Sequence, residues 1–251
     1  MSNHQISITA EFVSLIKSRS NDKYNYFVSN KTRNIYKFVS SIFSENEIEK
    51  IFRNRLALSI EFDEFIKKNN FETIVEFGAG YSLRGFEYSL KNKDEIYIDT
   101  DFVEVVEVKK QILLNICKDF NIIYPDNYIL LSADVLSDDI AEKLNPYLKN
   151  KNLFLAEGLT PYFNFKEYSN FLSQIRSFLE QSQNVFFSQE NFLKKHSTIY
   201  KVLRKFVSFL TKNSSNLKFE TKDDLIKFLN GEGFNNCQAY YKDENLFYKI
   251  N

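Results

Sequence analysis

From residue 73 onward, short apolar runs alternate with segments of helical periodicity, and this alternation limits the possible folds more than any other feature. Helical periodicity fills the intervals near residues 84–91, 102–120, 137–144 and 165–181. Strands that alternate with helices indicate βαβ units, and therefore a parallel sheet that helices cover on both faces. The apolar runs that we predict as strands are Thr73–Phe77, Glu95–Ile98, Tyr128–Ser132, Leu153–Ala156 and Val185–Ser188.

Both ends of the chain depart from this rhythm. Residues 1–70 carry apolar side chains at spacings of three and four, which predicts helices over Ile6–Lys17, Tyr24–Phe43 and Glu45–Lys68. Near the other end, Thr221 and Asp224 have the spacing of a capping box and open a helix that we expect to stop at Gly231 or Gly233. Two strand-like runs then follow with the spacing of an antiparallel hairpin, Cys237–Tyr241 and Leu246–Ile250.

These patterns predict an α/β fold of the Rossmann-like, doubly wound kind, with five parallel strands and a closing antiparallel hairpin in one seven-stranded sheet. We expect a single domain over residues 1–251, because repeats and Pro- or Ser-rich linkers are absent from the sequence. Its parts would be a helical N-terminal cap (1–70), a ligand-binding core (71–190), a helical lid (191–220) and a C-terminal helix with the hairpin (221–251). The lid prediction rests on the helical periodicity of Asn191–Leu210, for which a minimal sheet has no place.

Composition excludes several classes of function. The 33 basic and 33 acidic residues balance, and no basic block is long enough for a nucleic-acid binder. No apolar run approaches the ~18 residues of a membrane-spanning helix, and the N-terminal residues lack the features of a signal peptide. Cys117 and Cys237 stand far apart without ligand-spaced neighbours, which indicates free thiols and no zinc site. We therefore expect a cytoplasmic protein with no membrane or nucleic-acid partner; its oligomeric state stays open.

Glycine is scarce, and half of it falls in one place. The chain has six glycines, where average composition would give about 17. Gly78, Gly80 and Gly85 lie within eight residues after the first predicted strand, where glycine lets the backbone approach a ligand closely. A tight turn without a ligand would also fit. A dinucleotide fingerprint needs a third Gly or Ala where Leu83 stands, so the spacing favours a ligand without pyrophosphate over NAD.

Acidic residues accompany four successive strand ends. Each one alone would also suit a solvated helix N-terminus, where the macrodipole favours Asp and Glu. Asp101 stands where a carboxylate accepts hydrogen bonds from ribose hydroxyls, and Asp134 stands where one accepts from an adenine amino group. Together with Glu76 and Glu157, these positions predict a pocket for a cationic nucleoside.

Four ordered motifs resemble the S-adenosylmethionine-dependent methyltransferases that include leucine carboxyl methyltransferase and the polyketide O-methyltransferase of tetracenomycin synthesis. The first-strand motif LGAG-x-DTR-x-x-R corresponds to FGAGYSLRGFE, and E-V-D-x-P followed by Lys corresponds to Asp99–Val103 and Lys109. A third strand that ends in Asp-Leu corresponds to Asp134-Val135, and AEG-x-x-x-Y corresponds to AEGLTPYF. Upstream, Thr9-Ala-Glu, Lys17 and Arg53 also match. The resemblance runs from about Thr9 to Phe163 and more weakly to Gly233-Phe234.

This resemblance implies a cofactor and a role for each matching residue. The loop of Gly78, Ala79 and Gly80 would pack against the methionine portion of S-adenosylmethionine. Asp101 would hold the ribose, and Asp134 with Val135 would contact the adenine. Glu157 would face the ammonium of the amino acid. Its carboxylate would be bound by Lys17 and Arg53, with Arg55 as the alternative to Arg53.

The resemblance also implies an O-methyltransferase, and the departures from the family pattern concern its acceptor. The family's Asp-Thr pair is Ser82-Leu83 here, its second Arg is Glu87, and its Pro after the acid is Val103. A carboxylate acceptor needs only a cation or donor to hold it, for which we predict Arg84. A hydroxyl acceptor benefits from a general base, for which His196 is the candidate, and Tyr162 would line the acceptor site.

Three hypotheses remain, and the altered Ser82-Leu83 loop motivates the second of them. In the first, the acceptor is a small molecule, in preference to a protein C-terminal carboxylate, and no metal takes part because no metal-ligand constellation is visible. The second is a non-catalytic S-adenosylmethionine-binding sensor or scaffold. The third and least favoured is an NAD-linked oxidoreductase.

Overall fold

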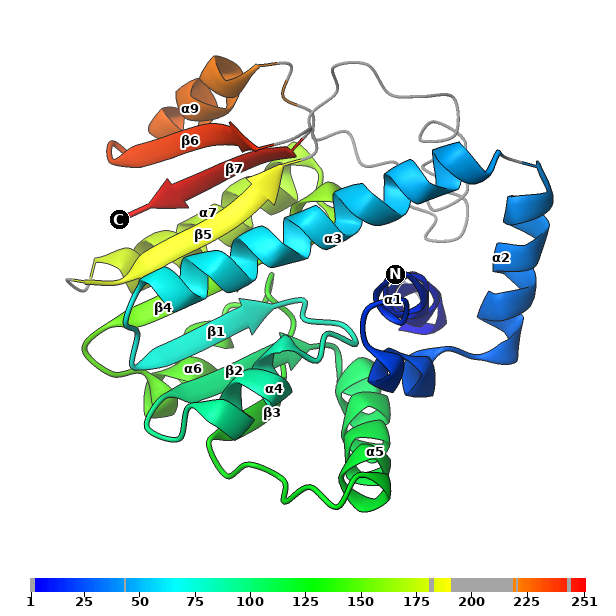
Figure 1. The fold of residues 1–251 in the computed structure, drawn as a ribbon. Coiled ribbons are helices and arrows are strands. Elements are labelled where there is room, and N and C mark those ends of the chain that lie inside the picture. The colour runs from blue at the N-terminus through cyan, green and yellow to red at the C-terminus, as the bar shows by residue number, and fades with distance from the viewer. Residues whose placement is uncertain (1–2, 43, 181–182, 191–218, 220, 243–244) are drawn as a thin grey trace.

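A seven-stranded sheet forms the centre of the protein in a computed structural model that describes residues 3–42, 44–180, 183–190, 219, 221–242 and 245–251 (Figure 1). The strand order is β3-β2-β1-β4-β5-β7-β6, with β1 to β5 parallel and β7 antiparallel to both of its neighbours. The predicted fold class is therefore confirmed. The strands are β1 (Thr73–Phe77), β2 (Ile96–Asp101), β3 (Tyr128–Ser132), β4 (Asn152–Ala156), β5 (Val185–Glu190), β6 (Cys237–Lys242) and β7 (Asn245–Ile250).

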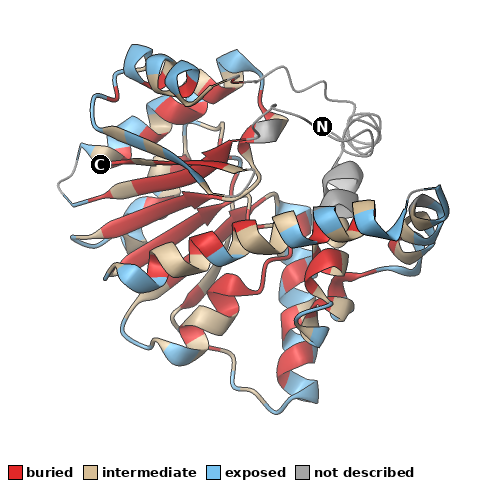
Figure 2. Ribbon diagram, turned by 45° about the horizontal axis from the view of Figure 1, so that its top comes forward, coloured by how far each residue is buried: buried red, intermediate tan, exposed pale blue. Residues whose placement is uncertain are grey.

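Helices cover the two faces of this sheet, and burial alternates along the strands to match. Side chains of one set, which includes Ile74, Tyr97 and Phe187, pack with α3, α4 and α5. The opposite set, which includes Val75, Ile98 and Phe186, packs with α6, α7 and α9. Figure 2 shows β1, β2, β4, β5 and β7 as mostly buried, whereas β6 at the edge of the sheet consists of half-buried and exposed residues. The helices are α1 (Asn3–Lys17), η1 (Asp22–Phe27), α2 (Asn30–Ile42), α3 (Glu45–Lys68), α4 (Arg84–Lys91), α5 (Val103–Asp119), α6 (Ile140–Leu144), η2 (Asn145–Tyr147), η3 (Thr160–Tyr162), α7 (Phe165–Leu179) and α9 (Lys222–Gly231).

The order of the strands reverses between β1 and β4. The chain runs outward from β1 to β2 and β3, and then returns to place β4 on the other side of β1. The loops that follow β1 and β4 therefore lie next to each other at the carboxyl edge of the sheet. Open α/β sheets bind their ligands at such a point.

Most predicted elements are confirmed, with two informative differences. The helix predicted over Tyr24–Phe43 is wrong as one unit, because the chain forms η1 and then a separate α2. The Glu11 carboxylate accepts hydrogen bonds from the backbone N–H and hydroxyl of Ser29 and from the Thr32 hydroxyl, which fixes the start of α2. Strand β2 continues to Asp101 rather than ending at Ile98, so Asp99 and Asp101 belong to the strand. The predicted lid, Asn191–Leu210, lies outside the described residues.

The N-terminus of α9 is the capping box that the sequence predicts. The backbone N–H of Asp224 donates to the Thr221 hydroxyl at 3.1 Å, and the Asp224 carboxylate accepts from the Thr221 N–H at 2.9 Å.

In the part of the chain that the structure describes, the helices are all too short or too polar to cross a membrane.

Gly85 has a packing role that the sequence left unexplained. It lies in α4 against the sheet, and a Cβ at this position would stand 2.5 Å from the Tyr97 ring and 2.8 Å from the Tyr128 ring. Both rings are buried, and their hydroxyls donate to Glu76 and Asp99 respectively, so neither ring is free to move aside. Only glycine allows α4 to approach β2 and β3 this closely.

We therefore expect Gly85→Ala to lower the free energy of unfolding by about 1–3 kcal/mol through overpacking. Gly231→Ala is the matched control, because it is also helical and nothing lies within 4 Å of the added Cβ. Urea denaturation of the two variants measures the difference. Equal stabilities would contradict the packing role of Gly85.

Candidate functional site

The loops after β1 and β4 meet through a glycine and a leucine. Gly78 has a φ of +62°, a backbone conformation that L side chains rarely adopt, and an added Cβ would stand 2.9 Å from Leu159 Cδ1. Gly80 has a φ of +51°, and the Cβ of Ala10 on α1 would lie 3.4 Å from an added Cβ there. The loop is thus enclosed by the β4 loop on one side and by the N-terminal helix on the other.

The β1 loop is also tied to the end of β2. The Gly80 N–H donates to Asp101 Oδ2 at 2.7 Å, and the Ala79 N–H donates to the Thr100 carbonyl at 3.0 Å. The Asp101 side chain is buried, and burial raises its pKa although the N–H groups of Gly80 and Phe102 act against that shift. The carboxylate predicted to hold a ribose therefore also fixes the glycine loop.

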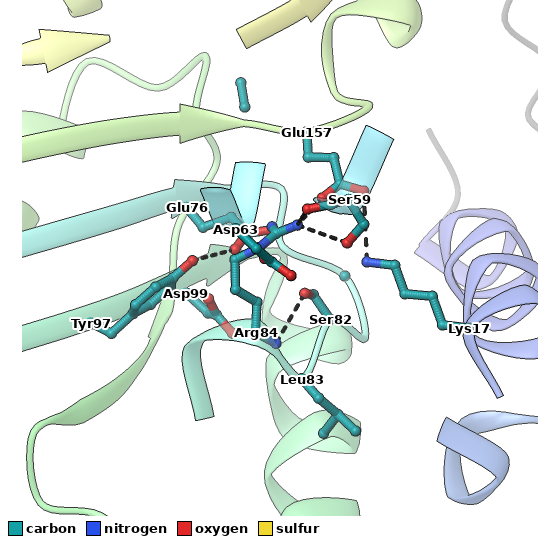
Figure 3. A network of polar contacts seen from close by, with 12 residues as sticks. Lys17, Ser59, Asp63, Glu76, Ser82, Leu83, Arg84, Tyr97, Asp99 and Glu157 are labelled. Atoms are coloured by element: carbon teal, nitrogen blue, oxygen red, sulfur yellow. Dashed lines mark hydrogen bonds and ion pairs between the residues drawn. The ribbon is translucent and has the colours of Figure 1, made fainter. Parts of the chain in front are cut away.

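Behind this loop, Arg84 is the centre of a buried network of charges (Figure 3). Its Nη1 lies 2.8 Å from Glu76 Oε1, its Nε lies 2.6 Å from Asp63 Oδ1, and its Nη2 pairs with Glu157. Nη2 also donates to the Ser59 hydroxyl at 2.9 Å. One guanidinium thus joins α3, β1, α4 and the β4 loop.

The network has a second branch within the sheet. The Tyr97 hydroxyl donates to Glu76 Oε2 at 2.7 Å, and Asp99 stands opposite Glu76 in the register of β1 and β2. Asp99 pairs with the buried Lys109 at 2.6 Å and accepts from the Tyr128 hydroxyl. Burial raises the pKa of Glu76, while the positive charge of Arg84 opposes that shift.

Glu157 stays ionised because cations surround it. Burial alone would raise its pKa, but Lys17 and Arg84, with a smaller effect from Arg55, outweigh burial and hold the pKa at about 2. Lys17 Nζ is 3.6 Å from Glu157 Oε1, and its side chain is only 7% exposed. Burial acts to lower the pKa of Lys17, but Glu157 raises it above the ordinary value, so the pair stays charged at neutral pH.

The structure separates the two arginines that the sequence left as alternatives. Arg53 is exposed on α3, whereas Arg55 is half-buried on the same helix. A Cβ at Gly158, whose φ is +71°, would stand 3.4 Å from Arg55 Nη1. Arg55 and Lys17 therefore approach the β4 loop together, whereas the side chain of Arg53 is exposed.

The other predicted residues are Asp134, Val135, Tyr162 and His196. Asp134 is exposed, and its Oδ1 accepts from the Leu136 N–H at 2.9 Å, so it shapes its own turn at the end of β3, while the adjacent Val135 is buried. Tyr162 is half-buried in η3. His196 lies outside the described residues.

Sequence reasoning missed Ser59 and Asp63, and it assigned Glu76 to a ligand pocket, whereas the structure pairs Glu76 with Arg84 and Tyr97. Ser59 and Asp63 carry no recognisable signal on α3, since serine and acidic residues are common on exposed helix faces. Glu76 did carry one, because an acidic residue within the apolar run Thr73–Phe77 requires a buried partner. Among the residues that the structure describes, no cluster of three or more His, Cys, Asp or Glu side chains is arranged to hold a metal ion.

The comparisons with known proteins identify the family. The family model of leucine carboxyl methyltransferase matches residues 15–176, more than half of the chain. The chain belongs to the leucine carboxyl methyltransferase family. This match spans the glycine loop, the Arg84 network and the β4 loop. No curated protein matches the chain in sequence.

Solved structures share the fold at low sequence identity. PigF, solved with S-adenosylhomocysteine (SAH), has a TM-score of 0.55 and 11% identity, over 74% of this chain and 53% of PigF. Human N-acetylserotonin methyltransferase in complex with S-adenosylmethionine (SAM) has a TM-score of 0.51 and 14% identity, over 72% of this chain and 47% of its own. A candidate O-methyltransferase from Nostoc punctiforme PCC 73102 has a TM-score of 0.52 and 12% identity, over 97% of this chain and 71% of its own. The chain thus spans about half the length of the first two.

The leucine carboxyl methyltransferase family uses SAM as its cofactor, and the charges of this site fit it. The amino-acid end of SAM is a zwitterion, which needs cations for its carboxylate and an anion for its ammonium. Lys17 and Arg55 are cations beside the anionic Glu157, so both signs of charge are present at the end of β4. Gly78 and Gly80 provide a backbone turn without side chains at the neighbouring loop.

We expect Arg84→Met to destabilise the fold by about 3–5 kcal/mol, because it leaves Glu76 and Glu157 buried without their shared cation. Lys67→Met on the exposed face of α3 removes a charge without a buried partner and should stay within about 0.5 kcal/mol of wild type. Thermal unfolding of both variants checks this. A small, equal effect of the two would show that the network contributes little.

Proposed function

We propose that this protein is a SAM-dependent O-methyltransferase that methylates a carboxylate or hydroxyl of a small molecule. The observation that carries the proposal is the group of charges at the point where β1 and β4 diverge. Lys17, Arg55 and Glu157 are matched to an amino-acid zwitterion, and they lie beside the glycine loop that Asp101 holds. The family membership supports methyl transfer as the chemistry.

The residue roles follow the order of the strands. Gly78, Ala79 and Gly80 would lie along the methionine portion, and Asp101 would accept from the ribose hydroxyls with lone pairs that the loop N–H groups leave free. Val135 and Asp134 would border the adenine at the end of β3. Lys17 and Arg55 would bind the carboxylate, and Glu157 the ammonium.

When bound, SAM supplies an electrophilic methyl group on a sulfonium. The protein's contribution would be to align the acceptor with this group and to exclude water. Arg84 would act as a positioning residue, since its guanidinium is already shared among Asp63, Glu76 and Glu157. This differs from a direct contact with an acceptor carboxylate, the role that the sequence alone suggests for Arg84.

Two kinds of acceptor remain in the proposal. A carboxylate needs no base, and its recognition would fall to donors near Tyr162 at the end of β4. A hydroxyl or phenol benefits from a base within hydrogen-bond reach, and His196 keeps that role as a proposal. The test is to supply SAM with panels of small carboxylates and of small alcohols and phenols, and to measure SAH. SAH formed with one panel only would assign the acceptor class.

A non-catalytic SAM-binding protein is the second candidate, and Ser82-Leu83 favours it. Where the family has Asp-Thr, Leu83 is fully buried and the Ser82 hydroxyl accepts from the Arg84 N–H, so both side chains serve the start of α4. The Ser82 side chain is buried as well. Tight SAM binding with no SAH from either panel would support this candidate and contradict catalysis.

The two arginines on α3 provide a matched test of the cofactor site. Arg55→Met should weaken SAM binding by about 10–100-fold, since it removes a charge-assisted contact worth about 1.5–3 kcal/mol. Arg53→Met, two residues away and exposed, should leave the dissociation constant within about twofold. Isothermal titration calorimetry with SAM and SAH measures both. The reverse order would return the carboxylate-binding role to Arg53.

A further inference from the structure

The carboxyl end of β5 holds a buried acid that the cofactor site does not use. Glu190, the last residue of β5, is 4% exposed. Glu76, Asp99 and Glu157 each pair with a cation. The groups that act on Glu190, among the residues that the structure describes, are the hydroxyls of Tyr168, Thr160 and Tyr248, with no charged side chain among them. An ionised carboxylate is costly in such surroundings, so the neutral acid is favoured.

These hydroxyls form a connected chain behind the sheet. The Tyr168 hydroxyl of α7 lies 2.8 Å from Glu190 Oε1 and also contacts the Tyr248 hydroxyl of β7. Tyr248 in turn contacts Ser188, whose hydroxyl donates to the Ala156 carbonyl at 2.9 Å. Ala156 precedes Glu157, so the hydrogen-bonded chain runs from the end of β5 to the residue before the cofactor site.

A second link connects Glu190 to the turn that carries Tyr162. Thr160 begins η3 and is fully buried, and its hydroxyl donates to the carbonyl of Gln189 at 3.1 Å. The same hydroxyl acts on the Glu190 carboxyl. The Thr160 hydroxyl therefore links η3 to β5. It has a single proton to donate, and the Gln189 carbonyl and the Glu190 carboxyl compete for it.

We propose that Glu190 is a positioning residue of the acceptor site, and that its neutral carboxyl keeps η3 and Tyr162 seated against the end of β5. The assignment of η3 to the acceptor site rests on the proposed function. When Glu190 ionises, the new charge attracts the Thr160 hydroxyl away from the Gln189 carbonyl, and the turn shifts. Burial raises the pKa of Glu190 to about 8, against the effect of the Tyr168 and Thr160 hydrogen bonds. The turn would thus respond to pH just above neutrality.

A fluorophore on the turn tests this directly. The chain contains no tryptophan, so Tyr162→Trp places a single indole on η3. We expect its emission maximum to shift as the pH rises through about 8, in a range of about pH 6 to 9 that stays below ordinary tyrosine ionisation. In Tyr162→Trp/Glu190→Gln, whose amide cannot ionise, the emission should stay constant. Emission that is constant in both proteins, or that shifts equally in both, would overturn the proposal.

Thr160→Val is the matched control for the link. Valine keeps the shape of threonine and removes the shared hydroxyl, so in the Tyr162→Trp background the emission should no longer follow pH although Glu190 remains. A pH response that survives Thr160→Val would contradict the role of this hydroxyl.

Stability measurements give an independent readout. A folded-state pKa above the ordinary carboxyl value means that the native state keeps a proton that the unfolded chain releases. Wild-type stability should therefore fall, relative to Glu190→Gln, as the pH rises from about 4.5 to about 8. Parallel melting temperatures of the two proteins across this range would show that Glu190 is not held neutral. Neither readout uses cofactor or acceptor, so failure of the proposed function would appear only in the SAM binding and SAH measurements.

Discussion

One positive charge, that of Arg84, organises the carboxyl edge of this sheet. A guanidinium buried among Asp63, Glu76 and Glu157 sets the relative positions of a helix, a strand and a loop that are distant in sequence. Burying these charges is expensive, and only close, well-oriented pairs offset the loss of hydration. The pairs of Arg84 connect α3, β1 and the β4 loop, and one of them orients the Glu157 carboxylate.

Neighbouring strands β4 and β5 show how surroundings decide the charge of one residue type. Glu157 directly follows β4, and Glu190 is the last residue of β5. Lys17 and Arg84 keep the first ionised, with a pKa of about 2, whereas the second, among the described residues, is surrounded by hydroxyls and has a pKa of about 8. The edge of the sheet thus presents a fixed negative charge at one strand and a neutral acid at the next. Their difference follows from which side chains the helices bring to each strand end.

The sequence predicts the fold well and the site in part. The periodicity of apolar residues and the positions of turn residues are local properties of the sequence. The strands, the capping box at Thr221 and the loop of Gly78 and Gly80 therefore follow from neighbouring residues alone. Contacts between distant elements do not. Whether Arg53 or Arg55 faces the β4 loop depends on the rotation of α3 over the sheet, and the partners of Arg84 depend on where that helix crosses. The need for glycine at position 85 depends on two tyrosines of other strands.

The position of α1 has a consequence for how the site comes into being. Lys17 and Ala10 belong to the start of the chain, yet their contacts are with Glu157 and Gly80, which are synthesised much later. Contacts of such large sequence separation form slowly, because the intervening chain must lose its freedom first. We therefore expect the Lys17–Glu157 pair to be among the late contacts of folding. The pocket is thus completed by a helix that precedes every strand of the sheet in sequence.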